Sequence, residues 1–203
     1  MNKLSIMQNA LGQQWDLLPL ALKNHYGSNC MGENHATGEL DIEFPWFMKL
    51  PLHFMRLFGA LVNKRGNKLK TSVTKTMCGN KQQWHRVINF PDGKVINFNS
   101  TFIADKDGFI EYINNYLGLK MTAFVKGSRL YYESRGYVLK IGKISISIPE
   151  WLALGHASII ESEFRQDDTQ TFIMDFRIKH PLFGEVFCYK GKFKTKLVNS
   201  QES

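Results

Sequence analysis

The sequence lacks the cysteine pattern of a disulfide-rich or zinc-binding protein. Three cysteines occur in 203 residues, Cys30, Cys78 and Cys188, and no C-x-x-C spacing is present. An odd number of isolated cysteines does not make a disulfide framework, and a structural zinc site needs closely spaced ligands. The pattern predicts reduced thiols in a cytoplasmic protein.

We expect neither a leader nor a membrane-spanning run in this sequence. The N-terminal stretch "MNKLSIMQNALGQQWDLLPLAL" has no unbroken apolar core followed by a small-residue cleavage site, so we do not expect a signal peptide. The most apolar window, "FPWFMKLPLHFMRLFGALV", is interrupted by Lys49, Pro51, His53 and Arg56. A spanning helix needs ~20 mainly apolar residues, so this window is not predicted to be one.

Motifs of well-known enzyme classes are missing. The chain contains no Walker loop, no G-x-G-x-x-G and no G-x-S-x-G, and its six histidines show no H-x-x-x-H spacing. No cysteine stands beside a histidine in the way that thiol catalysis would need. The sequence therefore predicts no catalytic residue, no cofactor and no metal, and it favours a protein that is not an enzyme.

Positive charge is in excess but is spread out. The net charge is +8 and the pI is about 9.4, yet no block of five or six like charges occurs. A general solubility charge or an anionic partner would explain the excess, and no specific nucleic acid is expected. Lysines at every second position from Lys190 to Lys196 predict either a phosphate or membrane contact, or a solvated strand face that discourages edge pairing.

Apolar and aromatic residues are abundant enough for one core. Hydrophobic residues make up 43% of the chain, so residues 1–198 are predicted to form a single domain, with a frayed tail at 199–203. A helix is expected from Ala10 to Tyr26, kinked or divided at Pro19 and stopped by Gly27.

A second helix is expected from Trp46 to Leu61, and Pro51 should interrupt it in the middle. Its predicted apolar stripe consists of Phe47, Leu50, Phe54, Leu57, Phe58 and Leu61. The stripe is typical of a helix packed on the core. The alternatives are a lid and a helix that rests on a membrane surface.

Most of the chain from Leu69 onward predicts β-strands. Turn signals recur every ~8–14 residues, the spacing of an antiparallel sandwich or barrel. In residues 172–178, Phe172, Met174, Phe176 and Ile178 share one face. We expect a mainly β fold, an antiparallel calycin-like barrel or strongly curved sheet with two N-terminal helical segments. The alternative is an α+β helix-grip fold, which would normally have a long C-terminal helix.

One hairpin places an arginine on an apolar face. In "WHRVINFPDGKVINFNSTF", the alternation puts Trp84, Arg86, Ile88 and Phe90 on one side, and "PDG" predicts the turn. A buried guanidinium must be paired, because its isolated desolvation costs several kcal/mol. The candidate partners are Glu111, Glu133, Glu161 and Asp175, and we prefer Glu161. Arg86 would then either be structural or hold the head group of a ligand.

A resemblance to a known family adds to this. The segments "WHRVINF…INFNS", "IPEWLAL", "ESEF" and "MDFRIKHPLFGEVFCYKGKF" resemble a bacterial family of unknown function over about Leu18 to Phe193. Members occur alone or as a C-terminal module behind a saccharopine-dehydrogenase-like or short-chain-dehydrogenase-like NAD-binding domain. This chain has no nucleotide-binding half, so the resemblance implies at most a partner oxidoreductase acting in trans. It marks the following positions: Trp84, Arg86, Ser100, Pro149, Glu161, His180, Pro181, Gly184, Tyr189 and Gly191.

Three functions fit these observations. The preferred one is a non-catalytic module that binds a small apolar or amphiphilic anionic ligand inside the barrel. The second is an enzyme, or the substrate-binding accessory of a partner dehydrogenase, in which Arg86, Glu161 and His180 converge. The third is a binder of an anionic membrane or nucleic-acid surface. The predicted ligand-binding residues are Trp84, Arg86, Phe98, Ser100, Glu161, Phe172, Met174, Phe176, His180 and Tyr189.

Overall fold

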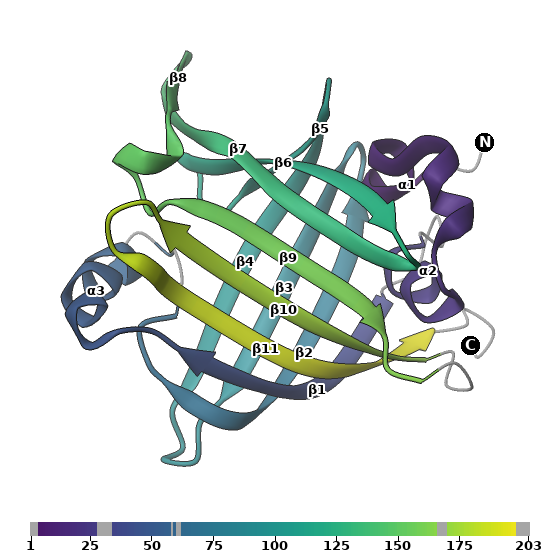
Figure 1. The fold of residues 1–203 in the computed structure, drawn as a ribbon, viewed down its shortest axis with the longest axis horizontal. Coiled ribbons are helices and arrows are strands. Elements are labelled where there is room, and N and C mark those ends of the chain that lie inside the picture. Colours follow the sequence, from purple (N-terminus) through teal and green to yellow (C-terminus); the bar gives the residue numbers. More distant parts are fainter. Residues whose placement is uncertain (1–3, 28–33, 58, 60–61, 166–169, 198–203) are drawn as a thin grey trace.

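The chain folds into a closed antiparallel β-barrel (Figure 1). We describe it from a computed structural model, in which residues 4–27, 34–57, 59, 62–165 and 170–197 are placed. The strands are β1 (Asn34–Glu43), β2 (Gly66–Cys78), β3 (Lys81–Asn89), β4 (Val95–Asp105), β5 (Gly108–Tyr112), β6 (Leu117–Lys126), β7 (Arg129–Ile141), β8 (Ile144–Ile148), β9 (His156–Glu163), β10 (Thr171–His180) and β11 (Gly184–Leu197).

Ten of these strands make the barrel. The order runs β6-β5-β4-β3-β2-β1-β11-β10-β9-β7, and the pairing of β6 with β7 closes it. Strand β8 pairs with the far end of β7 and projects from the barrel. Closure leaves no free edge among the ten strands. The predicted antiparallel barrel is confirmed, and the helix-grip alternative is wrong, because the sheet closes on itself through β6 and β7 instead of wrapping around a long helix.

The N-terminal segment closes one end of the barrel (Figure 1). It comprises α1 (Ile6–Leu11), the 3₁₀ helix η1 (Gly12–Leu17) and α2 (Leu20–Tyr26). Ser5 and Gln8 form a capping box at the start of α1. The predicted start of the helix at Ala10 is wrong, since α1 begins at Ile6 and a 3₁₀ helix follows from Gly12. Pro19 separates this 3₁₀ helix from α2 and Gly27 ends α2, as predicted, because proline lacks the N–H that a continuous helix would need.

The second helical segment lies at the opposite end of the barrel (Figure 1). It consists of the 3₁₀ helix η2 (Trp46–Met48) and α3 (Lys49–Leu57). The predicted interruption at Pro51 is wrong: Pro51 lies in the first turn of α3, where its missing N–H would have no helical partner anyway. Met48 and Leu52 are buried, whereas Leu50 and Phe54 of the predicted apolar stripe are 79% and 63% exposed.

The barrel interior holds one contiguous core. The alternation predicted in two regions is confirmed: Phe172, Phe176 and Ile178 of β10 are buried, as are Trp84 and Ile88 of β3. Ile6, Leu22 and Tyr26 of the N-terminal helices belong to the same cluster. The predicted boundary at residue 198 and the tail beyond it lie outside the described residues.

The lysine stripe of β11 lies on the outer surface, but β11 is not an edge strand. It pairs with β1 on one side and β10 on the other. In the register with β1, Lys192 lies opposite Glu39 and Lys190 opposite Asp41. The lysines therefore do not prevent pairing at a free sheet edge. The acidic residues opposite them on β1 offset part of their positive charge.

Candidate functional site

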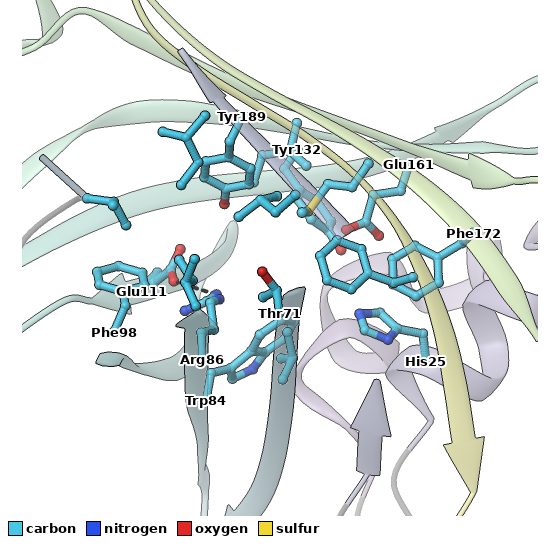
Figure 2. A pocket seen from close by; sticks show the side chains of 18 of the residues that line it. His25, Thr71, Trp84, Arg86, Phe98, Glu111, Tyr132, Glu161, Phe172 and Tyr189 are labelled. Atoms are coloured by element: carbon cyan, nitrogen blue, oxygen red, sulfur yellow. Dashed lines mark hydrogen bonds and ion pairs between the residues drawn. The ribbon is translucent and has the colours of Figure 1, made fainter. Parts of the chain in front are cut away.

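A small cavity lies inside the barrel, between helix α2 and the inner faces of the strands (Figure 2). Its volume is about 70 Å³. Most of the residues that line it are apolar or aromatic: Leu40, Ile42, Val62, Val73, Trp84, Ile88, Phe98, Phe102, Ile159, Phe172, Met174, Phe187 and Phe193. The polar side chains of its lining are His25, Tyr26, Thr71, Arg86, Glu111, Tyr132, Glu161 and Tyr189.

Four of these polar side chains lie in two groups at opposite sides of the cavity (Figure 2). Arg86 and Glu111 lie on one side, next to Phe98, and Glu161 and His25 lie on the other, next to Phe172. Thr71 and Tyr189 lie between these two groups (Figure 2). The cavity therefore has a mostly apolar lining with charged side chains at both ends.

Arg86 of β3 is held by two hydrogen bonds and two rings. One terminal nitrogen donates to Ser100 Oγ at 2.8 Å, and the other donates to Glu111 Oε1 at 3.1 Å. Its guanidinium carbon lies 4.8 Å from the centre of the Trp84 ring and 5.1 Å from that of Phe98. The side chains of Arg86 and Glu111 are 15% and 13% exposed, so this ion pair is mostly desolvated.

The predicted partner of Arg86 was wrong. Glu111 of β5 forms the ion pair, whereas Glu161 lines the other end of the cavity. The Arg86–Glu111 contact reaches diagonally across β4: Arg86 lies opposite Phe98, and Glu111 lies opposite Phe102, four residues further along β4. Strands β3, β4 and β5 are consecutive in the sheet, so their side chains on the inner face become neighbours.

A second buried cation, Lys75 of β2, lies behind the cavity wall. It is 2% exposed, and its Nζ donates a hydrogen bond to the carbonyl oxygen of His25 at 2.8 Å. The Nζ also lies 4.1 Å from the centre of the Tyr26 ring and 4.0 Å from that of Trp84. Burial, followed by the positive charge of Arg86, lowers the pKa of Lys75 well below its usual range, against the opposing effect of Glu161.

Glu161 of β9 is buried with one of its oxygens unsatisfied. Its Oε1 accepts a hydrogen bond from the hydroxyl of Tyr26 at 2.9 Å. Within the described residues, Glu161 Oε2 and the hydroxyl of Tyr132 have no hydrogen-bond partner, and both residues line the cavity. A buried polar group without a partner costs about 1–3 kcal/mol.

Protonation at this end of the cavity is shifted by burial. Burial raises the pKa of Glu161 to about 7, although Lys75 and the hydroxyl of Tyr26 favour its charged form. Burial, then Lys75 and Arg86, lowers the pKa of His25 well below its usual value. At neutral pH, His25 is therefore uncharged and Glu161 is poised between its acid and carboxylate forms.

Seven of the ten predicted site residues line this cavity: Trp84, Arg86, Phe98, Glu161, Phe172, Met174 and Tyr189. Ser100 is outside the lining but accepts a hydrogen bond from Arg86. Phe176 stacks on the ring of Tyr189 with their centres 4.4 Å apart.

His180 lies elsewhere. It is the last residue of β10, where its Nε2 lies 2.9 Å from the carbonyl oxygen of Trp151 and its Nδ1 accepts from the backbone N–H of Leu182. The expected convergence of Arg86, Glu161 and His180 is therefore wrong.

The remaining positions marked by the family resemblance have structural surroundings. Pro149 is the N-cap of the 3₁₀ helix η3 (Glu150–Leu152), and Pro181 lies in the β10–β11 turn beside Gly184, whose φ is +70°. At Gly191, a Cβ atom would come within 2.9 Å of the carbonyl oxygen of Glu39 on β1. These residues shape strand ends and strand contacts, not the cavity.

Sequence reasoning missed His25, Tyr26, Lys75 and Tyr132. A signal existed for Lys75, because the alternation of Leu69, Thr71 and Val73 carries it to the inner face of β2. No comparable signal existed for His25 and Tyr26. Their position inside the barrel depends on how α2 packs against the strands, and no local sequence pattern predicts that packing.

The described residues contain two free thiols, and they form neither a metal site nor a membrane-spanning helix. Within them, no three His, Cys, Asp or Glu side chains lie close enough together to hold a metal ion. Cys78 is an exposed free thiol and Cys188 a buried one, and Cys30 lies outside the described residues. The placed helices are all too short or too polar to cross a bilayer.

The fold and the cavity define a class: a closed antiparallel barrel with an internal, mostly apolar pocket that is polar at both ends. The family described as "Domain of unknown function (DUF4166)" matches residues 18–193, and the chain belongs to it. The match covers nearly the same range as the resemblance seen in the sequence. No curated protein matches the chain.

Proposed function

We propose that this domain is a non-catalytic binding module whose barrel cavity takes a small, largely apolar ligand with one polar group. The observation that carries the proposal is the pair of unsatisfied buried atoms, Glu161 Oε2 and the Tyr132 hydroxyl, in the wall of an apolar cavity. A ligand that hydrogen-bonds to them would remove their desolvation penalty. Apolar walls with a few convergent polar groups are the usual form of a small-molecule site.

The charge at each end favours a neutral polar group over the anionic head expected from the sequence. Glu111 already balances Arg86 at 3.1 Å, so a second carboxylate there would meet like charge in a poorly solvated place. At the other end, the pKa of Glu161 of about 7 lets its carboxyl group donate or accept a hydrogen bond. A hydroxyl, a carbonyl or a protonated carboxylic acid suits both ends.

The volume limits the size of the ligand. A cavity that holds benzene in another protein measures about 150 Å³, roughly twice the cavity seen here. Met174 lines the cavity and has three rotatable bonds, so a change of its rotamer is the simplest way to enlarge it. We therefore expect a compact ligand of few atoms, or a longer one that displaces Met174.

The test is native mass spectrometry of the purified protein, followed by denaturing extraction of any bound molecule and by titration with 1-hexanol and hexanoate. The cavity-filling variant is Ile159→Phe, and its control is Ile160→Phe, on the outward face of the same strand. We expect 1-hexanol, or an extracted neutral molecule, to bind the wild type and the control at least tenfold more tightly than Ile159→Phe. Equal binding by all three proteins, or none by a folded wild type, would overturn the proposal.

A polar catalytic site built from Arg86, Glu161 and His180 is not supported, because His180 is outside the cavity. The partner oxidoreductase implied by the family resemblance stays a prediction. It is tested separately from ligand binding, by co-purification with a nicotinamide-dependent dehydrogenase of the same organism.

A further inference from the structure

The end of the barrel that carries α3 exposes a group of large apolar side chains, which we call the apolar end surface. Trp46, Leu50 and Phe54 come from η2 and α3, Trp151 and Leu152 from η3, and Leu182 and Phe183 from the β10–β11 turn. Each of these seven side chains is more than half exposed, and Trp46, Leu50 and Leu182 are about 80% exposed. Soluble proteins seldom gather so many exposed apolar residues without a binding role.

Three segments distant in sequence meet at this end (Figure 1). The ring of Phe47 lies 6.1 Å from that of Phe183, which joins η2 to the β10–β11 turn. The Nε2 of His180 hydrogen-bonds to the carbonyl oxygen of Trp151, which joins that turn to η3. His180 was predicted from sequence as a site residue. In the structure it connects the β10–β11 turn to η3, two parts of the apolar end surface.

The helix has two apolar faces that serve different purposes. Met48 and Leu52 are four residues apart and point into the core. Trp46, Leu50 and Phe54 are spaced by four residues and form an outward stripe of their own. Packing on the barrel needs only the first face, so the second stripe is not explained by the stability of the domain.

The charge around the stripe is of one sign. No Asp or Glu occurs in η2 or α3, whereas Lys49 and Arg56 both lie on α3. On the other two segments, Glu185 is paired with Arg177 at 2.9 Å, and Glu150 accepts a hydrogen bond from the hydroxyl of Ser134. An anionic surface that contacts the helical segment would therefore meet basic side chains and no acid of that segment.

We propose that the apolar end surface docks this protein on the surface of a bilayer that contains anionic lipid. Tryptophan, phenylalanine and leucine on one face of a helix with lysine and arginine beside them are the features of helices that lie in the membrane interface. A fluid bilayer also accepts apolar residues that protrude from three separate turns, whereas a rigid protein partner would need a matching surface for each. The docking is peripheral, and it is independent of what the cavity binds.

The test is co-sedimentation with vesicles of 70% phosphatidylcholine and 30% phosphatidylserine, compared with pure phosphatidylcholine vesicles. The test variant is Trp46→Ser/Leu50→Ser. The matched control is Leu17→Ser/Leu20→Ser, which removes two exposed apolar side chains at the opposite end of the barrel. A third variant, Lys49→Glu, reverses one charge beside the stripe.

We expect the wild type and the control to partition equally onto the anionic vesicles. The double variant at 46 and 50 should lose at least tenfold in partition coefficient, and Lys49→Glu should lose a few-fold. Binding should fall in 0.5 M NaCl and on pure phosphatidylcholine. A blue shift of tryptophan emission on binding, absent in Trp46→Ser/Leu50→Ser, would show that the stripe enters the interface.

Several results would overturn the proposal. No binding of the folded wild type to anionic vesicles in 50 mM NaCl would do so. Equal binding by the Trp46→Ser/Leu50→Ser variant would mean that the general positive charge, and not the apolar end surface, binds lipid. A dimer detected by light scattering and abolished by the same variant would assign the surface to a second copy of the chain.

Discussion

Two cations lie inside this barrel on neighbouring strands, and they are accommodated differently. Arg86 and Lys75 both contact the ring of Trp84, at 4.8 and 4.0 Å from its centre. Arg86 has a carboxylate in direct contact and a hydroxyl beside it. Lys75 donates to a backbone carbonyl, and none of the described carboxylates lies within ion-pair distance of it.

The difference follows from the chemistry of the two side chains. The planar guanidinium of arginine cannot be deprotonated in a protein, so its burial requires a fixed partner. The ammonium of lysine can lose its proton, and burial lowers its pKa here. A paired, permanently charged group is typical of a structural role. A neighbourhood with shifted pKa values and an unsatisfied Glu161 oxygen is typical of a place where ligands bind.

The largest effect is expected from breaking the pair at Arg86. Glu111→Gln removes the counter-charge from a guanidinium that stays buried, and loss of one partner of such a pair costs about 3–5 kcal/mol. The free energy of unfolding in urea measures this. Replacing both groups, as Arg86→Met/Glu111→Leu, should cost much less than the single change, since no charge is left unpaired.

The surface supplies the control for this prediction. Arg177 and Asp175 form an ion pair whose side chains are about one third exposed. Asp175→Asn should cost less than about 1 kcal/mol. Equal losses for Glu111→Gln and Asp175→Asn would show that the Arg86 pair is solvated and that its structural role is wrong.

The next effect is a pH dependence carried by Glu161. Because its folded pKa of about 7 lies above the ordinary value of 4.5, the folded state binds the proton more tightly than the unfolded state. This stabilisation is fully present below pH 4.5 and is lost as the pH rises to 7, by about 3 kcal/mol for a shift of this size.

The measurement compares unfolding free energies of the wild type and Glu161→Gln from pH 4.5 to 8. We expect the wild type to lose stability relative to the variant across this range. The control is Glu163→Gln, on the same strand but only half-buried. The difference in unfolding free energy between this variant and the wild type should stay constant over the same pH range. If the difference in unfolding free energy between Glu161→Gln and the wild type also stays constant, Glu161 is ionised from pH 4.5 to 8. The proposal of a neutral ligand then loses its basis.

The smallest effect is expected at Lys75. Lys75→Met keeps the length of the side chain and its contact with Tyr26 and Trp84, and it removes the burial of an ammonium group. We expect the free energy of unfolding to change by no more than about 1 kcal/mol in either direction. Arg86→Met should cost more, since it leaves the buried carboxylate of Glu111 without its ion-pair partner. A loss from Lys75→Met as large as that from Glu111→Gln would show that the two cations have the same role.

The N-terminal segment and α3 show how far local patterns reach. Both have apolar residues at helical spacing, and both helices were predicted. Tyr26 and Leu22 of α2 are buried in the barrel, whereas Leu50 and Phe54 of α3 face solvent. Periodicity indicates that a helix forms, but the partner of its apolar face is set by the rest of the fold.

The cavity shows the same limit. Trp84, Phe98 and Phe172 were expected inside because a strand alternates its side chains, a property of each strand alone. The choice of Glu111 over Glu161 as the partner of Arg86 could not be reached in this way. It depends on which strands are neighbours and in which register, and several acids had equivalent local surroundings.

By itself the sequence determined the β-rich class, the hairpin with its inward arginine, and the faces of β3 and β10, because hydrophobic alternation and turn chemistry act over a few residues. Tertiary structure alone decided the closure between β6 and β7, the entry of His25 and Tyr26 into the barrel, and the outward stripe of α3. Those features rest on contacts between segments far apart in the chain. Their energies depend on which surfaces meet, and no short stretch of sequence contains that information.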